Sequence, residues 1–373
     1  MKIADITGFL EQWGPRDIAW DRDNTGLQIG DVTQPLKNIL LCMDLQEEVI
    51  DDALSRNCNL IITHHPFLFL PLKKLDLARD PKSKLIRQII NNNLCIYSMH
   101  TNLDFTADGV SFTLAKLLGL DNISFLAPIE KDQYKITVFV PENSAEVVGN
   151  AMFSAGAGII GNYSGCSFRS SGTGTFFGNE NSNPAAGVKN RFEKVEEIRL
   201  EVVADAWLVE RVVKAMTAAH PYEEPAYDIY PVTNKNKNYG IGAIGEYENP
   251  VKTSEFLEIV SKAIDQKCLR YSRNHPEKIK KVAMTGGSGF EYMKFALAEG
   301  ADAYLTADLK YHDFQSAEGK ILLIDGGHYE TEQKTLKTVK NKIQKHFGKE
   351  MPAGIYFAGV NSVRYFYTKK ENK

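Results

Sequence analysis

Two adjacent histidines, His64 and His65, follow a strand-like aliphatic run in the stretch "IITHHPFLFLP" (61–71). Imidazole nitrogen is a ligand for zinc, iron and manganese ions. Neighbouring side chains of an extended chain point to opposite sides, so the two rings cannot easily chelate one ion but could each reach a different ion. Taken alone, the pair could equally be structural or exposed to solvent in a loop.

A second stretch, "CIYSMHTNLDFT" (95–106), places His100 and Asp104 after another strand-like run. The segment is rich in turn-forming residues, so Asp104 could simply accept hydrogen bonds from nearby backbone amides. A carboxylate four residues after a histidine, at the end of a strand, is also a candidate metal ligand beside a candidate proton carrier.

The third stretch, "LLIDGGHYETEQKTLKTVKNKIQKHF" (322–347), predicts a strand followed by a helix that begins near His328. The apolar stripe of this helix continues backward through Glu332 to His328, so both polar side chains face the core. An inward carboxylate needs a cation, a hydrogen-bond network or water as its partner. A histidine and a glutamate four residues apart on one helical face therefore favour metal binding.

The elements that must position these residues are α/β units. Residues 38–65 predict strand, helix and strand, and residues 279–308 repeat that order, which places Thr63 on Thr306 and His65 on Asp308. A structural pseudo-repeat is one interpretation, and chance similarity is the other. Ligands of open α/β sheets bind beyond the carboxyl ends of the strands. Three histidines and two carboxylates at such ends suit two ions that share a carboxylate better than one tetrahedral ion.

The segment between these halves has a different pattern. It predicts the order β-α-β-β-α-β of the split ferredoxin-like motif, with a glycine-opened hairpin at 166–178. The expected strands are 133–141, 196–205 and 226–232, and the expected helices are 144–156 and 206–220. We therefore predict an α/β core in two parts, 1–130 and 234–373, with an inserted α+β domain at 131–233.

Composition limits the function. A hydrophobic fraction of 43% and a charged fraction of 24% are ordinary for a globular protein, and a net charge of −3 argues against nucleic-acid binding. The N-terminal stretch predicts an amphipathic helix rather than a signal peptide, and no apolar run approaches the ~18 residues that span a bilayer. Five scattered cysteines without a CxxC pair fit a reducing compartment. We expect a cytoplasmic protein without a membrane partner.

The motifs "THHP", "HTNLD" and "DGGHYETE", with "WDRDNTGLQIGD" (20–31) and "TGGSG" (285–289), resemble the GTP cyclohydrolase 1 type 2 homologue family. This family is also called NGG-interacting-factor-three-like. The stretch "AAHPYEEPAYDIYP" (218–231) resembles the PII- or CutA-like domain that the longer bacterial members carry. The resemblance implies a toroidal homohexamer with two divalent ions per subunit, either zinc, iron or manganese.

The resemblance also implies a ligand set. Its members match the family motifs at five positions: His64, His65, Asp104, His328 and Glu332. Glu332 would bridge the two ions, with His65 and Asp104 on one ion and His64 and His328 on the other. Apart from the resemblance, His312 follows the second strand of the repeat, so it either lines the same crevice or lies on the surface. His220 of the inserted segment could belong to a second metal or effector site, or to a loop that packs between subunits.

Two classes of function follow. The first is a metal-dependent hydrolase, and if its substrate is GTP, an activated water would attack C8 of guanine with His100 as a possible proton shuttle. The glycines of 285–289 would then hold the triphosphate, unless they form only a tight turn between strand and helix. A dinuclear phosphoesterase or amidohydrolase could use the same residues. The second class is a metal-binding regulatory or interaction protein without turnover.

Overall fold

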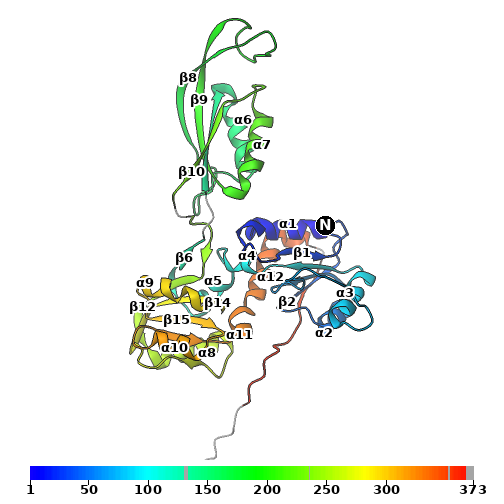
Figure 1. Cartoon of the computed structure of the whole chain (residues 1–373), viewed down its shortest axis with the longest axis vertical. Coiled ribbons are helices and arrows are strands. Elements are labelled where there is room, and N and C mark those ends of the chain that lie inside the picture. The colour runs from blue at the N-terminus through cyan, green and yellow to red at the C-terminus, as the bar shows by residue number, and fades with distance from the viewer. Residues whose placement is uncertain (130–132, 235, 352, 367–373) are drawn as a thin grey trace, which may run out of the picture. The chain divides into compact units, whose positions relative to one another are not determined.

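The computed structural model describes residues 1–129, 133–234, 236–351 and 353–366. The chain forms two compact units: a core unit made of 1–127 and 239–373, and an inserted unit made of 128–238 (Figure 1). Two short strands, β6 (Ala127–Pro128) and β11 (Gly240–Ile241), pair where the chain leaves and re-enters the core unit. None of the helices in the described ranges is long and apolar enough to cross a membrane.

The first sheet of the core unit has the strand order β1-β4-β3-β2-β17. Its centre is parallel: β2 (Asn38–Cys42), β3 (Cys58–Thr63) and β4 (Cys95–Ser98) run in one direction. β17 (Ile355–Phe357) adds to β2 in parallel, and β1 (Gly26–Ile29) closes the other edge in the antiparallel direction. The helices of this half are α1 (Ile3–Trp13), α2 (Glu47–Ser55), α3 (Pro81–Asn91), α4 (Thr101–Asp104) and α12 (Thr335–Phe347).

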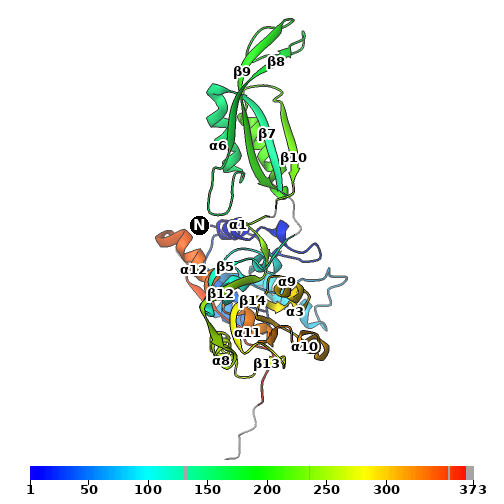
Figure 2. The same ribbon diagram turned by 90° about the vertical axis from the view of Figure 1, so that its left-hand side faces the viewer.

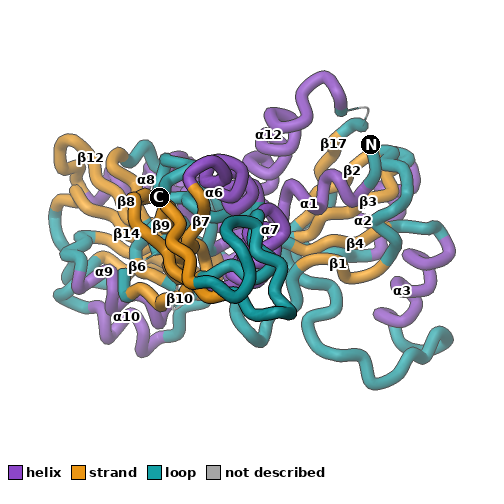
Figure 3. Tube along the Cα trace, turned by 90° about the horizontal axis from the view of Figure 1, so that it is seen from above, coloured by secondary structure: helices purple, strands orange, loops and turns teal. Residues whose placement is uncertain are grey.

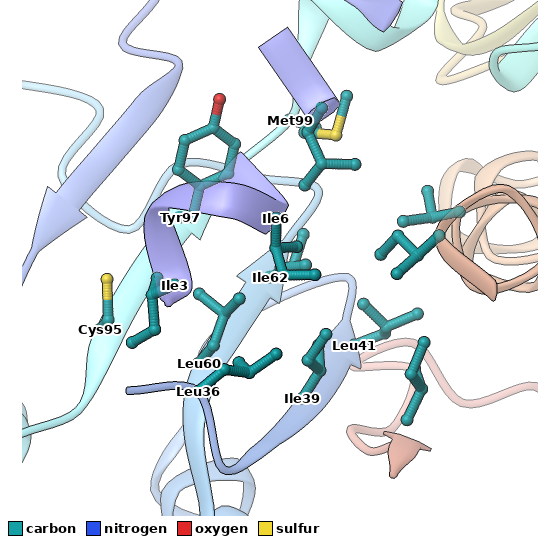
Figure 4. Packing of buried hydrophobic residues seen from close by; sticks show 14 of the residues in the cluster. Ile3, Ile6, Leu36, Ile39, Leu41, Leu60, Ile62, Cys95, Tyr97 and Met99 are labelled. Atoms are coloured by element: carbon teal, nitrogen blue, oxygen red, sulfur yellow. The ribbon is translucent and has the colours of Figure 1, made fainter. Parts of the chain in front are cut away.

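The amphipathic helix predicted at the N-terminus is confirmed as α1. Its residues Ile3, Ile6 and Leu10 are fully buried and belong to one hydrophobic cluster with residues of β2, β3 and β4; Figure 4 shows Ile3 and Ile6 beside these strands. Burying an aliphatic side chain of this size contributes roughly 1.5–3 kcal/mol. The packing therefore fixes the strands whose carboxyl ends carry the candidate ligands.

The second sheet of the core unit has the order β13-β16-β15-β14-β12-β5; Figure 3 shows β12 and β14 of this sheet. β14 (Lys278–Ser288), β15 (Ala303–Ala307) and β16 (Leu322–Asp325) are parallel. The antiparallel strands are β5 (Asp121–Ser124), β12 (Ala243–Lys252) and β13 (Arg270–Tyr271). The helices are α5 (Val110–Leu117), α8 (Thr253–Ile264), α9 (Met293–Ala298), α10 (Tyr311–Ala317) and α11 (His328–Glu332). The expected mixed α/β class is confirmed.

The inserted unit has one antiparallel sheet with the order β10-β7-β9-β8. Its elements in chain order are β7 (Gln133–Pro141), α6 (Ala145–Ser154), β8 (Phe168–Phe177), β9 (Phe192–Asp205), α7 (Val209–Ala219) and β10 (Tyr227–Val232). α6 and α7 cover one face of the sheet, where Val138, Val148 and Leu200 are buried (Figure 1).

The hairpin predicted at 166–178 is wrong. β8 is one strand that pairs with β9 along its whole length, from Phe168 opposite Glu201 to Phe177 opposite Phe192. Gly172 and Gly174 lie within this strand instead of forming a turn. The chain reverses after Gly178, between β8 and β9.

Candidate metal centre

The adjacent histidines keep the hydrogen-bond pattern of the sheet after β3 ends. The backbone N–H of His64 donates to the Cys42 carbonyl, and that of His65 donates to the Met43 carbonyl, both at 3.0 Å. The chain is therefore extended there, and the two side chains leave it on opposite sides. His64 is buried and His65 is partly buried, and their ring centres lie 5.0 Å apart.

Four imidazole rings of the core unit are oriented in the same way, by an oxygen atom beside Nδ1. In each ring, Nδ1 lies within hydrogen-bond distance of an oxygen, so Nε2 is left for another partner. The partners are Met99 O for His64 (2.8 Å), Asp44 for His65 (2.9 Å), Asp23 for His100 (2.9 Å) and Asp308 for His328 (2.7 Å). A carbonyl oxygen only accepts, so His64 must carry its proton on Nδ1 when it is neutral.

Glu332 lies at the centre of the rings. Its Oε1 is 3.7 Å from His64 Nε2, and its Oε2 is 3.2 Å from His65 Nε2 and 3.3 Å from His328 Nε2. The residue is almost completely buried, with 3% of its surface exposed. One carboxylate therefore turns one oxygen toward His64 and the other toward His65 and His328.

Gly287 makes the space for this carboxylate. A Cβ atom at this position would lie 2.2 Å from Glu332 Oε1, and the backbone has a φ of +59°, which disfavours other residues. Its amide donates to Thr331 Oγ1 at 3.0 Å. The "TGGSG" segment leads into a helical turn at Phe290–Tyr292 and then into α9, as a tight turn between strand and helix would, and the Gly287 amide is not free for a phosphate. The first four residues of the segment end strand β14.

The structure brings the other predicted residues to the same place. Asp104 Oδ1 lies 3.8 Å from His64 Nε2, and the ring of His100 is 5.4 Å from that of His64. The resemblance implied that His65 and Asp104 bind one ion and that His64 and His328 bind the other. The distances in the structure favour different pairs. Instead His64 lies beside Asp104, and His65 lies beside His328, with 3.3 Å between their Nε2 atoms.

The charges of the cluster are strongly coupled. Burial alone would raise the pKa of Glu332, but the neighbouring imidazoles of His64, His328 and His65 outweigh it and hold that pKa well below its usual range. Burial also opposes the charge on His65, yet hydrogen bonds to Asp44 and Glu332 raise its pKa to about 10. The bond to Glu332 raises the pKa of His328 to about 9. Burial raises the pKa of Asp104.

The donor atoms fit a metal ion. Two of them, His64 Nε2 and Asp104 Oδ1, are buried and have no hydrogen-bond partner among the described residues. Buried polar atoms normally have partners, so these two need one. Two groups, each with ligand atoms within 4.8 Å of one another, could hold an ion: His64, His65 and His100, and His65, His328 and Glu332. Nitrogen and carboxylate ligands suit zinc, iron and manganese.

Three orienting carboxylates were not found from the sequence. Asp44 follows β2, and Asp308 follows β15 in the position that the repeat aligns with His65. Asp23 lies in the "WDRDNT" motif, which entered the sequence analysis only through the family resemblance. It is buried beside Thr101 and His100, and the hydrogen bond to His100 outweighs burial and lowers its pKa to about 2. A search for carboxylates at the other strand ends could have found the first two.

Two other histidines do not join the cluster. His312 is exposed on α10, where Nδ1 lies 3.2 Å from Gln315 Oε1. His220 of the inserted unit is buried, with Nε2 3.0 Å from the Phe139 carbonyl and Nδ1 accepting from the Tyr222 amide. Both of its ring nitrogens are thus used within the inserted unit.

The fold and the cluster define a class: α/β proteins with a candidate metal centre of histidines and carboxylates at the strand ends. The chain belongs to the Duf34/NIF3 (NGG1p interacting factor 3) family, whose model matches residues 1–362. The resemblance found in the sequence is thereby confirmed.

Relatives and solved structures agree with this membership. The chain is 39% identical to a GTP cyclohydrolase 1 type 2 homolog of Halalkalibacterium halodurans over 92% of this chain and 94% of the relative. It is 38% identical to a homolog of the same name from Bacillus subtilis, over 87% of both chains. A crystal structure of a Bacillus cereus protein related to NIF3 has a TM-score of 0.84, with 37% identity over 99% of both chains.

Proposed function

We propose that the cluster is a dinuclear divalent-metal centre of a metal-dependent hydrolase. The ligands would be His64 and Asp104 for one ion and His65 and His328 for the other, with Glu332 bridging the two. The observation that carries this proposal is the Glu332 carboxylate, which turns its two oxygens toward the two groups of imidazoles at 3.7, 3.2 and 3.3 Å. Zinc, iron and manganese are all compatible with the donor set.

Bound divalent ions would activate a water molecule as a nucleophile and stabilise developing negative charge on a substrate. The residues of the chain would supply orientation and proton transfer. Asp44 and Asp308 fix the rings of His65 and His328 through their Nδ1 atoms. His100 is held at Nδ1 by Asp23, so its Nε2 faces the other rings and can take or give a proton.

The substrate proposal is a nucleotide. Relatives with up to 39% identity carry the name GTP cyclohydrolase 1 type 2 homolog, which suggests opening of the guanine imidazole ring at C8. The bonded amide of Gly287 gives no support to the triphosphate site first expected at 285–289. The alternative hydrolase is a phosphoesterase that uses the same metal-binding residues.

A second candidate function is a metal-binding regulatory or interaction protein without turnover. The observation that favours it is the position of a cavity of about 580 Å³, which is lined by residues of the inserted unit and by none of the cluster. Ligand sites of enzymes usually lie in such cavities.

The architecture supports further proposals. We interpret the parallel strands β2-β3-β4 of the first core sheet and β14-β15-β16 of the second as a pseudo-duplication. We interpret the inserted unit as a ferredoxin-like domain of the PII/CutA type, because its sheet order β10-β7-β9-β8 suits that motif. We also propose a toroidal homohexamer. Light scattering on the purified protein should then give six times the chain mass of 41.8 kDa.

The test of the hydrolase uses metal-reconstituted protein and a panel of substrates that includes GTP and phosphodiesters. Wild type should turn over at least one of them, and Glu332→Gln should lose that activity while Glu299→Gln, an exposed carboxylate on the same half of the core, keeps it. Equal activity in wild type and Glu332→Gln would show that the cluster is not the catalyst. Metal binding without any turnover would favour the regulatory function.

A further inference from the structure

A cavity lies on the face of the inserted sheet that α6 and α7 do not cover. β8 and β9 continue beyond β7 and β10 as a two-stranded ribbon (Figure 2), and the cavity of about 580 Å³ lies against it. Ser170 and Phe139 both pair with Arg199, and Gly172 pairs with Glu197, so these lining residues share one face. The segments 182–186 and 222–224 complete the lining, and the Asn183 amide donates to Glu223 Oε1 at 2.7 Å.

The floor of the cavity is kept free of side chains by two glycines. A Cβ at Gly172 would meet nothing within 4 Å, so the glycine leaves open space where a strand normally carries a side chain. A Cβ at Gly174 would lie 2.1 Å from Glu197 Oε2. The carboxylate of Glu197 therefore lies across the bare backbone of β8, at the edge of the open space.

Two polar groups of the lining lie close together. Burial and the hydrogen bond to the Glu197 carboxylate raise the pKa of Tyr222, so the hydroxyl and the carboxylate are neighbours. Glu197 has no salt bridge with a basic side chain in the described parts of the chain. The carboxylate therefore has a hydrogen-bond partner but no cation beside it, and a cationic ligand would supply one.

The acidic side chains that line the cavity indicate the charge of its ligand. Glu197, Glu223 and Glu224 are acidic, and the one basic lining residue, Arg199, is engaged with Glu201 at 2.8 Å. The lining therefore favours a cation and disfavours an anion. A bare metal ion is disfavoured too, because the described part of the inserted unit contains no group of three metal-ligating side chains close enough to hold one.

The remaining walls are apolar. Phe139 and Phe176 line the cavity with Pro184 and Ala185, and aromatic faces attract ammonium groups. The volume falls in the range of small-molecule sites, roughly 300–1,000 Å³. We propose that this cavity binds a small organic cation, an amine with an apolar body, whose ammonium group pairs with Glu197 and whose body lies over Gly172. This site does not depend on the metal centre.

The binding test uses the full-length protein and three probes of nearly equal shape. Calorimetry or ligand-observed NMR should detect phenethylamine, which is a cation at neutral pH, but only weak binding of neutral 2-phenylethanol and none of phenylacetate. Binding should persist in Glu332→Gln, since the metal centre is not involved. If phenethylamine does not bind, or if the alcohol or the acid binds as well, the proposal is overturned.

Variants locate the site. Glu197→Gln should weaken phenethylamine binding at least about tenfold, because a charged hydrogen bond is lost. Glu196→Gln is the matched control, since this neighbour is exposed and accepts from Thr173 on the strand's other face. Gly172→Leu should fill the open space and abolish binding while the thermal unfolding temperature stays near that of wild type.

Two results with these variants would contradict the proposal. The first is unchanged binding in both Glu197→Gln and Gly172→Leu. The second is a change of oligomeric mass in Gly172→Leu, which would make the cavity an interface between copies of the chain.

Discussion

The middle strands of the two core sheets, β3 and β15, occupy equivalent positions but end in different residues. β3 lies between β2 and β4 and is followed by His64 and His65, whereas β15 lies between β14 and β16 and is followed by Asp308. Asp308 does not face the rings as a ligand would. It holds Nδ1 of His328, while His65 presents Nε2 to Glu332.

The residues that follow the neighbouring strands β4 and β16 match more closely. β4 is followed by His100 and Asp104, and β16 is followed by His328 and Glu332, in both cases with a histidine four residues before a carboxylate. The same scaffold therefore places ligand candidates from two sheets around one carboxylate, with the second sheet supplying the bridge. The difference teaches that a strand end can either bind an ion or orient the residue that does.

The largest expected effect is on metal content, and it distinguishes the bridging carboxylate Glu332 from the terminal carboxylate Asp104. If the proposed two ions bind, Glu332→Gln should reduce the metal content from two ions per chain to less than one, because both ions lose a shared charged ligand. Asp104→Asn should retain one ion, since only the group with His64 is affected. Elemental analysis after dialysis measures both. Equal loss in the two variants would break the distinction between bridging and terminal carboxylates.

The next effect concerns Gly287, which leaves space for the bridging carboxylate of Glu332. Gly287→Ala should lower the free energy of unfolding by about 1–3 kcal/mol through overpacking against Glu332, and should also weaken metal binding. Gly300→Ala is the control: φ there is +68°, but a Cβ would meet nothing within 4 Å. Chemical denaturation of both variants isolates the clash from the backbone strain. The interpretation fails if the two variants lose the same stability and bind metal equally.

The orienting carboxylates of the two sheets should act alike despite their different positions. Asp44→Asn and Asp308→Asn should each weaken metal affinity about ten- to hundredfold, because the ring of His65 or of His328 is no longer fixed. Competition with a chromophoric chelator gives the affinities. Loss in only one variant would mean that the two sheets do not contribute symmetrically.

The smallest effect is the pH dependence. Before a cation binds, His65 with a pKa of about 10 and His328 with a pKa of about 9 carry protons at pH 7.5. Ligation needs neutral imidazole, so binding must release these protons, and affinity should rise about tenfold per pH unit for each proton released. Calorimetry at pH 7.5 in buffers of different ionisation enthalpy counts the protons. A binding enthalpy independent of the buffer would contradict this.

The sequence predicted the elements and the cluster better than their partners. Hydrophobic periodicity located α1, β2 and β3. The rule that ligands bind beyond the carboxyl ends of parallel strands predicted that His64, His65 and Glu332 lie together. It could not reveal Asp23, because that residue reaches His100 across 77 positions of the chain. A single sequence does not show which distant side chain faces a given atom.

Glycines account for the clearest errors. Gly172 and Gly174 were interpreted as opening a hairpin, and Gly287 as part of either a phosphate loop or a tight turn, but all three lie within strands. Two of them exist because a glutamate carboxylate passes close to the backbone: Glu197 over Gly174 and Glu332 over Gly287. Close approach and turn formation both select glycine, and only the three-dimensional arrangement distinguishes them.

Anomalous diffraction from crystals of the metal-loaded protein tests the central claim most directly. The account predicts two metal peaks per chain: one bound by His64 and Asp104, the other by His65 and His328, with Glu332 contacting both. A single peak, or two peaks that Glu332 does not join, would contradict it.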